Sequence, residues 1–442
     1  MKKMKSHAMA IILLSAMVAL SGCGSSNKGA DKEVSGNKEE QKPETVQTVK
    51  LKFYAQYSGQ EKAAYDAAKE AMKKIMPEVE VEFEVAAQDD EQKIKTYAAA
   101  GTLPDIFFAS SGLIETLKNS DNLLILDDAV KANDIESKLN ETSKAMLWNK
   151  DGHSYAVPNV GQWASVLYYN KEIFDQNSIK VPANYTELLE AVTALKAKDI
   201  TPLALFAKEK WTGVQLLDMA IVGSDPGGLK KLDNGEGTFA DEAYAQGAKK
   251  LEELTKAGLL SKNAFNTTYD DAVAQFTSGK AAMLLNGAWA MGALEEGLGE
   301  GKIGLLYTPF TDADKVDSVQ WNISGGGFNQ GFAVSKNTKY PEVAAKYAAL
   351  ISLEFNKQRV IQIGDPNPVL VEDVQPEKGF TPIQQEYAKD AVNFKSMTTF
   401  AWGFENAKFK TVIEDNSQKL LAGQAADDFI KDMNKELERV RQ

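Results

Sequence analysis

The residues best suited to catalysis or metal binding are scarce in this chain of 442 residues. It contains two histidines, His7 and His153, and a single cysteine, Cys23. A cluster of His and Cys side chains that holds a metal is therefore not expected. A Ser-His-Asp or Cys-His mechanism would have to use His153, which stands in an Asp-Gly turn. We interpret His153 as a solvated turn residue and predict no catalytic residue, no metal site and no cofactor.

The six tryptophans offer a different chemistry, because a flat indole can stack on the apolar face of a ring-shaped ligand. Tryptophan stands at positions 148, 163, 211, 289, 321 and 402. Any one of these side chains, taken alone, is more often a core residue than a platform. Trp148 is expected to pack beside the turn at Asp151.

Length and charge narrow the possible classes of protein. A chain of 442 residues with 43% hydrophobic residues suits two globular domains, since one domain typically has about 150–200 residues. The formal net charge is −12. Nucleic acid is therefore not expected as a partner, because phosphate binding needs clustered Lys and Arg.

The N-terminal region has the pattern of an export signal followed by a linker. Lys2, Lys3 and Lys5 precede an apolar run over 8–20 that is too short to span a bilayer comfortably. The run ends in L-S-G-C at residues 20–23, which resembles a bacterial lipobox and implies cleavage before Cys23 and a lipid on its thiol. An ordinary signal with an accidental cysteine is the alternative. Residues 24–47 are polar and predict a flexible tether.

Strands and helices alternate after residue 48. Apolar residues at 49, 51 and 53 predict a strand, and the spacing over 60–76 predicts a helix that Pro77 stops. Strict alternation of Val or Phe with Glu over 78–85 predicts a strand with one face in water, near a sheet edge. A helix over 91–100 and a buried strand at 106–108 follow. This order favours an α/β fold with a parallel sheet.

The segment 151–174, DGHSYAVPNVGQWASVLYYNKEIF, has an unusual pattern. Two short apolar runs, 155–158 and 166–169, are separated by Pro, Asn and Gly. This predicts two strands with an irregular joint between them.

Several further elements are expected after residue 174. A helix over 182–198 is capped near Asn184 or Thr186. Asp312, Asp314 and Asp317 lack the Gly and terminal Glu of a calcium loop and predict a solvated turn. The remaining expectations are a surface loop at 224–237, an amphipathic helix at 241–257, a helix from 341 to about 354, and helical stretches at about 382–421 and 425–440.

Several motifs together resemble one family. They are G-x-L-P-D-I at 101–106, the segment 151–174, and F-x-x-G-K-A-A-M-x-x-N-G-x-W at 276–289, in addition to the lipobox. The chain is identified as a member of the family 1 extracellular solute-binding lipoproteins of carbohydrate ABC importers, similar in plan to maltose-binding protein. The resemblance covers most of the chain from about residue 48.

The resemblance implies a two-lobe periplasmic-binding-protein-like fold of type II. Each lobe is a mostly parallel sheet flanked by helices, and hinge segments cross between the lobes at about 158–163, 320–327 and 368–382. The expected organisation is a lipoprotein signal peptide at 1–22, a tether at 23–47, lobe 1 at 48–158 and 324–372, and lobe 2 at 159–323 and 383–442.

The family pattern also indicates where the ligand binds. It implies a stacking aromatic at Trp289 and an acid with an aromatic two residues on at Glu209 and Trp211. Asn286 is expected either to bind a hydroxyl or to cap a turn. In the first lobe, polar residues follow the C-terminal ends of predicted strands, where open α/β sheets bind ligands. The candidate ligand-binding residues are Tyr57, Gln88, Asp89, Ser110, Ser111, Trp163, Glu209, Trp211, Asn286, Trp289, Trp321 and Trp402.

The expected function is capture of a carbohydrate, an oligosaccharide, for delivery to the permease subunits of an ABC transporter. The resemblance implies a monomer, lipid-anchored through Cys23 on the extracellular face of a bacterial cytoplasmic membrane, and no enzyme activity. One alternative is a secreted glycoside hydrolase that uses two carboxylates. Another is the same fold with a non-sugar ligand, such as a polyamine or glycerol phosphate.

Overall fold

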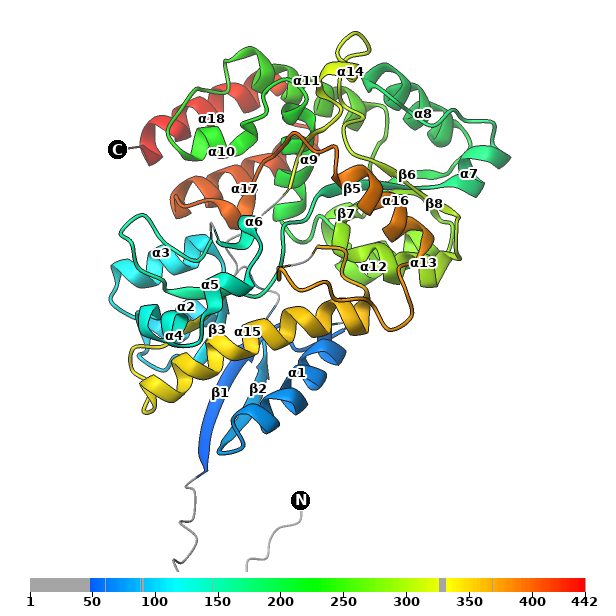
Figure 1. Ribbon diagram of the computed structural model, residues 1–442. Coiled ribbons are helices and arrows are strands. Elements are labelled where there is room, and N and C mark those ends of the chain that lie inside the picture. Colours follow the sequence, from blue (N-terminus) through cyan, green and yellow to red (C-terminus); the bar gives the residue numbers. More distant parts are fainter. Residues whose placement is uncertain are drawn as a thin grey trace, which may run out of the picture. The chain divides into compact units, whose positions relative to one another are not determined.

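A computed structural model describes residues 48–59, 61–87, 89, 91–144, 146–325, 331–367 and 369–441 (Figure 1). The predicted signal peptide, tether, Cys23 and Gln88 lie outside these residues and stay predictions, as does the part of the second crossing at 326–327. Within the described ranges, no helix has the length and apolar character needed to cross a bilayer.

The first sheet has the strand order β2-β1-β3-β10-β4. Strand β1 pairs parallel with β2 and β3, whereas β10 runs antiparallel to both β3 and β4. Strand β2 lies at the edge and buries Val79 and Val81 while exposing Glu80, which confirms the predicted edge strand. The strands span β1 Val49–Ala55, β2 Val79–Val85, β3 Ile106–Ala109, β4 Ala156–Pro158 and β10 Gly331–Val334.

Helices flank this sheet, and α1 packs along α15 (Figure 1). Phe53, Tyr65, Phe332 and Phe355 fill the core between strands and helices. Helix α15 continues beyond the expected end near residue 354, because no breaker occurs before Gly364, whose φ of 64° ends the helix. The helices span α1 Glu61–Ile75, α2 Gln92–Ala99, α3 Ser111–Asn119, α4 Asp127–Ala132, α5 Ile135–Lys138, α6 Glu141–Lys144 and α15 Pro341–Ile363.

The second sheet has the strand order β6-β7-β5-β8. Strands β6 and β7 are parallel, and β5 runs antiparallel to both β7 and β8. Strand β7, from the motif at 276–289, is buried along its whole length. One antiparallel strand in each otherwise parallel sheet agrees with the expected mostly parallel sheets. The strands span β5 Ser165–Asn170, β6 Thr201–Ala204, β7 Ala281–Gly287 and β8 Ile303–Leu306.

Helices also cover the second sheet. Asn184 caps α8 by accepting a hydrogen bond from the Glu187 amide, so one of the two proposed caps is confirmed. The helices span α7 Lys171–Gln176, α8 Tyr185–Ala197, α9 Trp211–Val222, α10 Gly228–Asp233, α11 Glu242–Lys256, α12 Tyr269–Thr277, α13 Met291–Leu298, α14 Val316–Val319, α16 Pro382–Ala391, α17 Ala407–Leu421 and α18 Ala426–Val440. Short 3₁₀ turns occur at η1 Ala264–Asn266, η2 Ala288–Ala290 and η3 Ala401–Gly403.

Two sequence predictions in this half are wrong. The stretch 224–237 is not simply a surface loop, because α10 lies within it and buries Leu229 and Leu232. The stretch 382–421 is not continuously helical either. It is interrupted by β11 (Ser396–Met397), which pairs with β9 (Asn322–Ile323) in a small separate sheet.

The segment 151–174 connects the two sheets as its pattern predicts. Strand β4 belongs to the first sheet and β5 to the second, with residues 159–164 between them. The segment runs beside the second connection, because the Ser165 amide donates to the Ser324 carbonyl at 2.8 Å. Gly325 there has a φ of 118°, and an added Cβ would lie 2.5 Å from the Ser165 nitrogen, so this position requires glycine.

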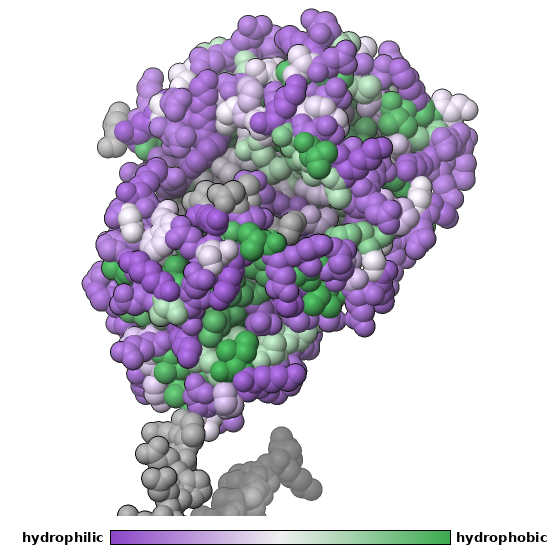
Figure 2. All heavy atoms as spheres, in the orientation of Figure 1, coloured by the Kyte–Doolittle hydropathy of each residue, from purple (hydrophilic) through white to green (hydrophobic). Residues whose placement is uncertain are grey.

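The surface shown in Figure 2 is mostly hydrophilic, with separate hydrophobic patches. Such scattered apolar residues are normal on a soluble domain. The large hydrophobic residues that are exposed in the described part are Ile75, Val85, Ile125, Tyr340, Val371 and Val392.

Candidate functional site

Four of the tryptophans converge from four separate segments. Trp163 lies between β4 and β5, Trp211 begins α9, Trp289 lies in η2 after β7, and Trp402 lies in η3. The ring centroids of Trp163 and Trp289 are 4.3 Å apart and those of Trp211 and Trp402 are 4.5 Å apart. The two pairs also contact each other, with Trp163 6.2 Å from Trp402 and Trp211 6.5 Å from Trp289.

Phe400 completes this group, which we call the tryptophan cluster (Trp163, Trp211, Trp289, Phe400 and Trp402). Its ring lies 5.5 Å from Trp163 and stacks at 6.3 Å on Trp211. The residue between Phe400 and Trp402, Ala401, has a φ of 46°. This conformation is uncommon for a residue other than glycine and often marks a functional segment.

The cluster has an inner and an outer part. Trp163 and Trp211 are 5% and 4% exposed, whereas Trp289 and Trp402 remain partly exposed. The Trp289 ring lies against Gly287, where an added Cβ would be 1.9 Å from a ring carbon. The buried pair therefore supports two outer indoles, whose remaining surface is open to a ligand.

Polar groups adjoin these rings. The Trp211 indole N–H donates to Glu209 Oε2 at 2.8 Å, and Glu209 is itself partly exposed. This geometry brings together the acid and the aromatic that the sequence pattern singles out. A carboxylate fixed beside an indole suits a sugar, because it accepts hydrogen bonds from hydroxyls while the ring covers an apolar face.

Asn286 is fully buried on β7 below the cluster. Its Oδ1 accepts a hydrogen bond from the Gly287 amide at 2.9 Å, so it caps the turn locally. Its side chain also adjoins the hydroxyl of Tyr269 on α12. Burial raises the pKa of the nearby Tyr269, and the side chains of Asn286 and Trp289 offset part of that rise.

The first-sheet candidates are engaged mainly in local structure. Ser110 caps α3 through a hydrogen bond from the Leu113 amide at 3.2 Å, and Asp89 accepts from the Lys93 amide at 3.0 Å. The Tyr57 hydroxyl donates to Asp66 at 2.5 Å, and its ring stacks on Phe83 at 4.7 Å. The structure does not bring these three side chains into contact with the tryptophan cluster.

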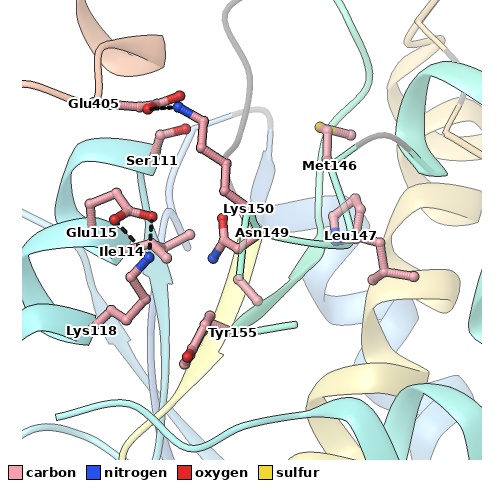
Figure 3. Close-up of a pocket in the computed structure, with 13 residues that line it drawn as sticks. Ser111, Ile114, Glu115, Lys118, Met146, Leu147, Asn149, Lys150, Tyr155 and Glu405 are labelled. Atoms are coloured by element: carbon pink, nitrogen blue, oxygen red, sulfur yellow. Dashed lines mark hydrogen bonds and ion pairs between the residues drawn. The ribbon is translucent and has the colours of Figure 1, made fainter. Parts of the chain in front are cut away.

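Ser111 lines a small cavity of about 90 Å³ beside α3 (Figure 3). One face of α3 forms one wall, and Figure 3 shows Glu115 and Lys118 paired on that face. Lys150 reaches across to Glu405, with 2.6 Å between Nζ and Oε2. A water molecule occupies about 30 Å³ of liquid volume, so this cavity holds a few waters but not a sugar ring.

Trp321 does not join the other four indoles. It lies 6.2 Å from Tyr307 and 6.1 Å from Phe394, in a second group of rings that also includes Tyr387. We call Tyr307, Trp321, Tyr387 and Phe394 the second aromatic cluster. Trp148 packs at the edge of the first core, with the Lys131 ammonium over its ring.

His153 and Asp312, which the sequence analysis considered for catalysis and calcium binding, each have a side-chain partner. His153 Nδ1 lies 2.9 Å from Asp127 Oδ2, and its side chain is 45% exposed, as a solvated turn histidine would be. Asp312 pairs with Lys250 at 2.6 Å. No group of three or more His, Cys, Asp or Glu side chains suited to a metal ion occurs among the described residues.

Sequence reasoning missed Phe400, Tyr269 and Gln215. Gln215, buried on α9, donates from Nε2 to the Asn286 carbonyl at 3.0 Å and thereby fixes β7 beside the cluster. Phe400 stands two residues before Trp402. This pair of aromatic residues around one small residue could have indicated that Phe400 belongs to the same cluster. No local pattern pointed to Tyr269 or Gln215, because their positions depend on helix packing.

Comparison with known proteins places this fold in a family. A family model described as "Bacterial extracellular solute-binding protein" matches residues 56–353. The multiple sugar-binding protein of Streptococcus mutans is 29% identical over 236 residues, which are 52% of this chain and 54% of that protein. An ABC transporter extracellular-binding protein of Pyrococcus horikoshii is 28% identical over 262 residues, 56% of this chain and 57% of that protein. The chain thus spans about half the length of these two relatives.

Solved structures share the fold over nearly all of the described residues. One, from work on xylan utilization by Caldanaerobius polysaccharolyticus, has a TM-score of 0.78 and 26% identity, covering 88% of this chain and 100% of that one. A chitin oligosaccharide binding protein has a TM-score of 0.76 and 24% identity, covering 89% of this chain and 99% of that one. They confirm the predicted α/β fold of the type II periplasmic-binding-protein plan. The family model covers more than half of the sequence, and this chain belongs to the family of bacterial extracellular solute-binding proteins.

Proposed function

We propose that this protein binds an oligosaccharide at the tryptophan cluster and delivers it to the permease of an ABC importer. The observation that carries the proposal is the convergence of Trp163, Trp211, Trp289 and Trp402 from four separate segments, with Glu209 beside them. A hydrophobic core alone does not require four indoles packed beside a partly exposed carboxylate.

The arrangement of the cluster favours a ligand with more than one sugar ring. Trp289 and Trp402 are both partly exposed, and both rest on the buried Trp163 and Trp211. Two supported platforms offer stacking surface to successive rings of one chain. Glu209 supplies a hydrogen-bond acceptor for hydroxyls.

We propose that binding closes two lobes, formed by 48–158 with 324–372 and by 159–323 with 383–442. Lys150 and Glu405 stand on opposite sides of that division and pair at 2.6 Å. On the same boundary, the Cβ of an alanine at Gly112 would lie 3.0 Å from the Phe404 carbonyl oxygen. A ligand drives such closure only through its higher affinity for the closed arrangement.

The names of relatives support a sugar as ligand. One relative is called a multiple sugar-binding protein, and one solved structure is a chitin oligosaccharide binding protein. We extend this ligand class to the present chain as a proposal. We also propose that the sugar is released unchanged, because the family consists of binding proteins and the site has no arrangement for catalysis among the described residues.

We further propose that the protein is a monomeric lipoprotein on the extracellular face of the cytoplasmic membrane. The support is the L-S-G-C motif at 20–23, preceded by lysines and an apolar run. Two or three acyl chains on one cysteine hold a protein at a membrane firmly, whereas a single chain is marginal. Mass spectrometry of the mature N-terminus tests this: a lipid-modified Cys23 is expected, and any other N-terminus would refute it.

A ligand screen tests the main proposal. Thermal unfolding is measured with mono- and oligosaccharides, and with spermidine and glycerol phosphate as non-sugar ligands. A ligand at 100 times its Kd stabilises the folded state by about 2.7 kcal/mol. We expect an oligosaccharide to give this shift, and chromatography after long incubation to recover it intact. Stabilisation by only a non-sugar ligand, or the appearance of shorter sugars, would overturn the proposal.

A further inference from the structure

A second cavity shares no lining residue with the tryptophan cluster. It has a volume of about 450 Å³, within the range of small-ligand sites. We call it the crossing groove, because residues from the connections between the two sheets line it. The lining residues are Asn140, Gln162, Pro366, Asn367, Tyr387, Ala391, Phe394, Lys395, Ser396 and Met397. None of them is a residue of the tryptophan cluster or a candidate ligand-binding residue of the sequence analysis.

One wall of the groove is aromatic and rigidly supported. Phe394 and Tyr387 line the groove with ring centroids 5.9 Å apart, and Trp321 and Tyr307 support Phe394 from behind at 6.1 and 5.4 Å. The backbone here is also fixed, because the Lys395 amide donates to the Trp321 carbonyl at 2.9 Å. The second aromatic cluster thus presents ring surface to this groove.

The polar groups of the groove are amides, hydroxyls and one cation. The Asn367 side chain is already hydrogen-bonded within the protein, because its Oδ1 accepts a hydrogen bond from the Tyr387 hydroxyl at 3.0 Å. Gln162 is partly exposed and Lys395 is exposed, and both line the groove. Gln162 precedes Trp163, so neighbouring residues of one connection serve the groove and the tryptophan cluster.

None of the ten lining residues is acidic. The buried carboxylate of Asp365 adjoins the groove through Asn367 and pairs with Arg359, with 2.6 Å between Nη2 and Oδ2. Arg359 also pairs with Glu61. Asp390, near Phe394 in the chain, accepts a hydrogen bond from Tyr307 at 3.1 Å. A cation beside amides and an aromatic face, without an acidic lining residue, favours a ligand that carries negative charge.

We propose that the crossing groove is a second ligand site that takes an anionic monosaccharide, a pyranose bearing a carboxylate or a phosphate. The ring would lie on Phe394 and Tyr387, Gln162 would bind hydroxyls, and Lys395 would bind the anionic group. This site is separate from the tryptophan cluster, and the inference goes beyond the proposed function without depending on it.

Isothermal titration of the full chain with glucuronate, glucose 6-phosphate and glucose tests the inference. Glucuronate and glucose 6-phosphate represent the two sources of charge. We expect at least one of them to bind, and glucose to bind about 10-fold or more weakly, because a charge-assisted hydrogen bond is lost. Failure of both anionic sugars to bind at millimolar concentration would overturn the proposal.

Variants then locate the binding. Lys395→Met should weaken the anionic sugar about 10-fold or more, while Lys389→Met, an exposed lysine of α16 outside the groove, should not. Affinity for the oligosaccharide should stay within about twofold in Lys395→Met, since the sites are separate. Unchanged binding in Lys395→Met, or loss of the anionic sugar in Trp289→Ala, would instead place that ligand elsewhere and refute the inference.

Discussion

The two aromatic clusters use similar side chains in different surroundings. In the tryptophan cluster, four indoles and Phe400 pack together, and the Trp211 ring nitrogen donates a hydrogen bond to the partly exposed Glu209. In the second aromatic cluster, two of the four rings are tyrosines, whose hydroxyls are bound to Asp390 and Asn367. The tyrosine hydroxyls thus bind the second aromatic cluster to neighbouring side chains. In the tryptophan cluster, the indoles of Trp289 and Trp402 remain partly exposed.

The comparison teaches that the surroundings of a tryptophan, more than its presence in a sequence motif, determine its role. Trp289 and Trp321 are both half-buried and both stand in segments with family-like patterns. Trp289 rests on other indoles beside a carboxylate, while Trp321 supports Phe394 from behind. We therefore propose that Trp289 stacks on the sugar and that Trp321 has a supporting role.

The largest effect is expected when the inner support of the tryptophan cluster is removed. Trp163 is 5% exposed and contacts Trp289, Phe400 and Trp402. Trp163→Ala should lower the free energy of unfolding by about 3–5 kcal/mol, measured by urea denaturation. Trp321→Ala should lower the free energy of unfolding by less, because Trp321 is only half-buried. An equal or larger loss for Trp321→Ala would remove the distinction between the inner tryptophans and Trp321.

A smaller effect is expected from one added methyl group. In Gly287→Ala, the Cβ would lie 1.9 Å from the Trp289 ring and must displace it. Overpacking of this kind costs about 1–3 kcal/mol, and oligosaccharide affinity should fall because the platform moves. Gly292→Ala is the control, since its Cβ would meet only the Gln384 amide at 3.3 Å and a carbonyl at 3.6 Å. Unchanged sugar affinity in Gly287→Ala would show that the ring position does not matter.

A further test concerns the acid that fixes the segment before Phe400. Asp218, buried on α9, accepts hydrogen bonds from the Leu229 amide and the Ser324 and Thr398 hydroxyls at 2.5–2.7 Å. Burial raises the pKa of Asp218, and these hydrogen bonds lower it by less. The folded state therefore holds the proton that the unfolded chain releases near pH 4, roughly the free value.

The raised pKa of Asp218 stabilises the folded state below about pH 4. This stabilisation is lost as the pH rises through the pKa that Asp218 has in the folded state. The wild-type free energy of unfolding should thus fall relative to that of Asp218→Asn between about pH 4 and 7. Urea denaturation across this range measures the difference. A difference that grows in favour of the wild type with rising pH would mean that the pKa of Asp218 is lowered.

The smallest effect is expected at the contact between Lys150 and Glu405. The Lys150 side chain is 83% exposed, so the pair is strongly screened by solvent. Lys150→Met should reduce oligosaccharide affinity by no more than about 1 kcal/mol, and the difference should vanish at high salt. Lys150→Arg should restore the wild-type affinity. A loss of affinity that salt does not change would mean that Lys150 contacts the sugar itself.

Much of the fold could be predicted from local pattern. The Val–Glu alternation over 78–85 revealed an edge strand, and the Pro-Asn-Gly interruption between 155 and 166 revealed the change of sheet. The end of α15 was missed because no breaker precedes Gly364. Helix α10 was missed because the Gly and Asp residues around it indicate a loop more strongly than its two buried leucines indicate a helix.

The candidate site was predictable in part, for a physical reason. Trp163, Trp211, Trp289 and Trp402 do come together, but nothing in their spacing separates them from Trp321, whose position depends on the pairing of β9 with β11. Ser110 and Asp89 illustrate a second difficulty. The same short polar side chains that bind ligands also cap helices and turns, and here both accept hydrogen bonds from nearby backbone amides.

Titration of one oligosaccharide into Trp289→Ala and Trp321→Ala, with the wild type beside them, tests the central claim most directly. The oligosaccharide is the one selected by the thermal screen, and far-UV circular dichroism confirms that both variants are folded. We predict that Trp289→Ala loses about 1–3 kcal/mol of binding free energy, as expected for an aromatic that stacks on a flat ring. Trp321→Ala should bind within about twofold of the wild type, because it is separate from the site. Wild-type affinity in Trp289→Ala, or a loss confined to Trp321→Ala, would contradict the account.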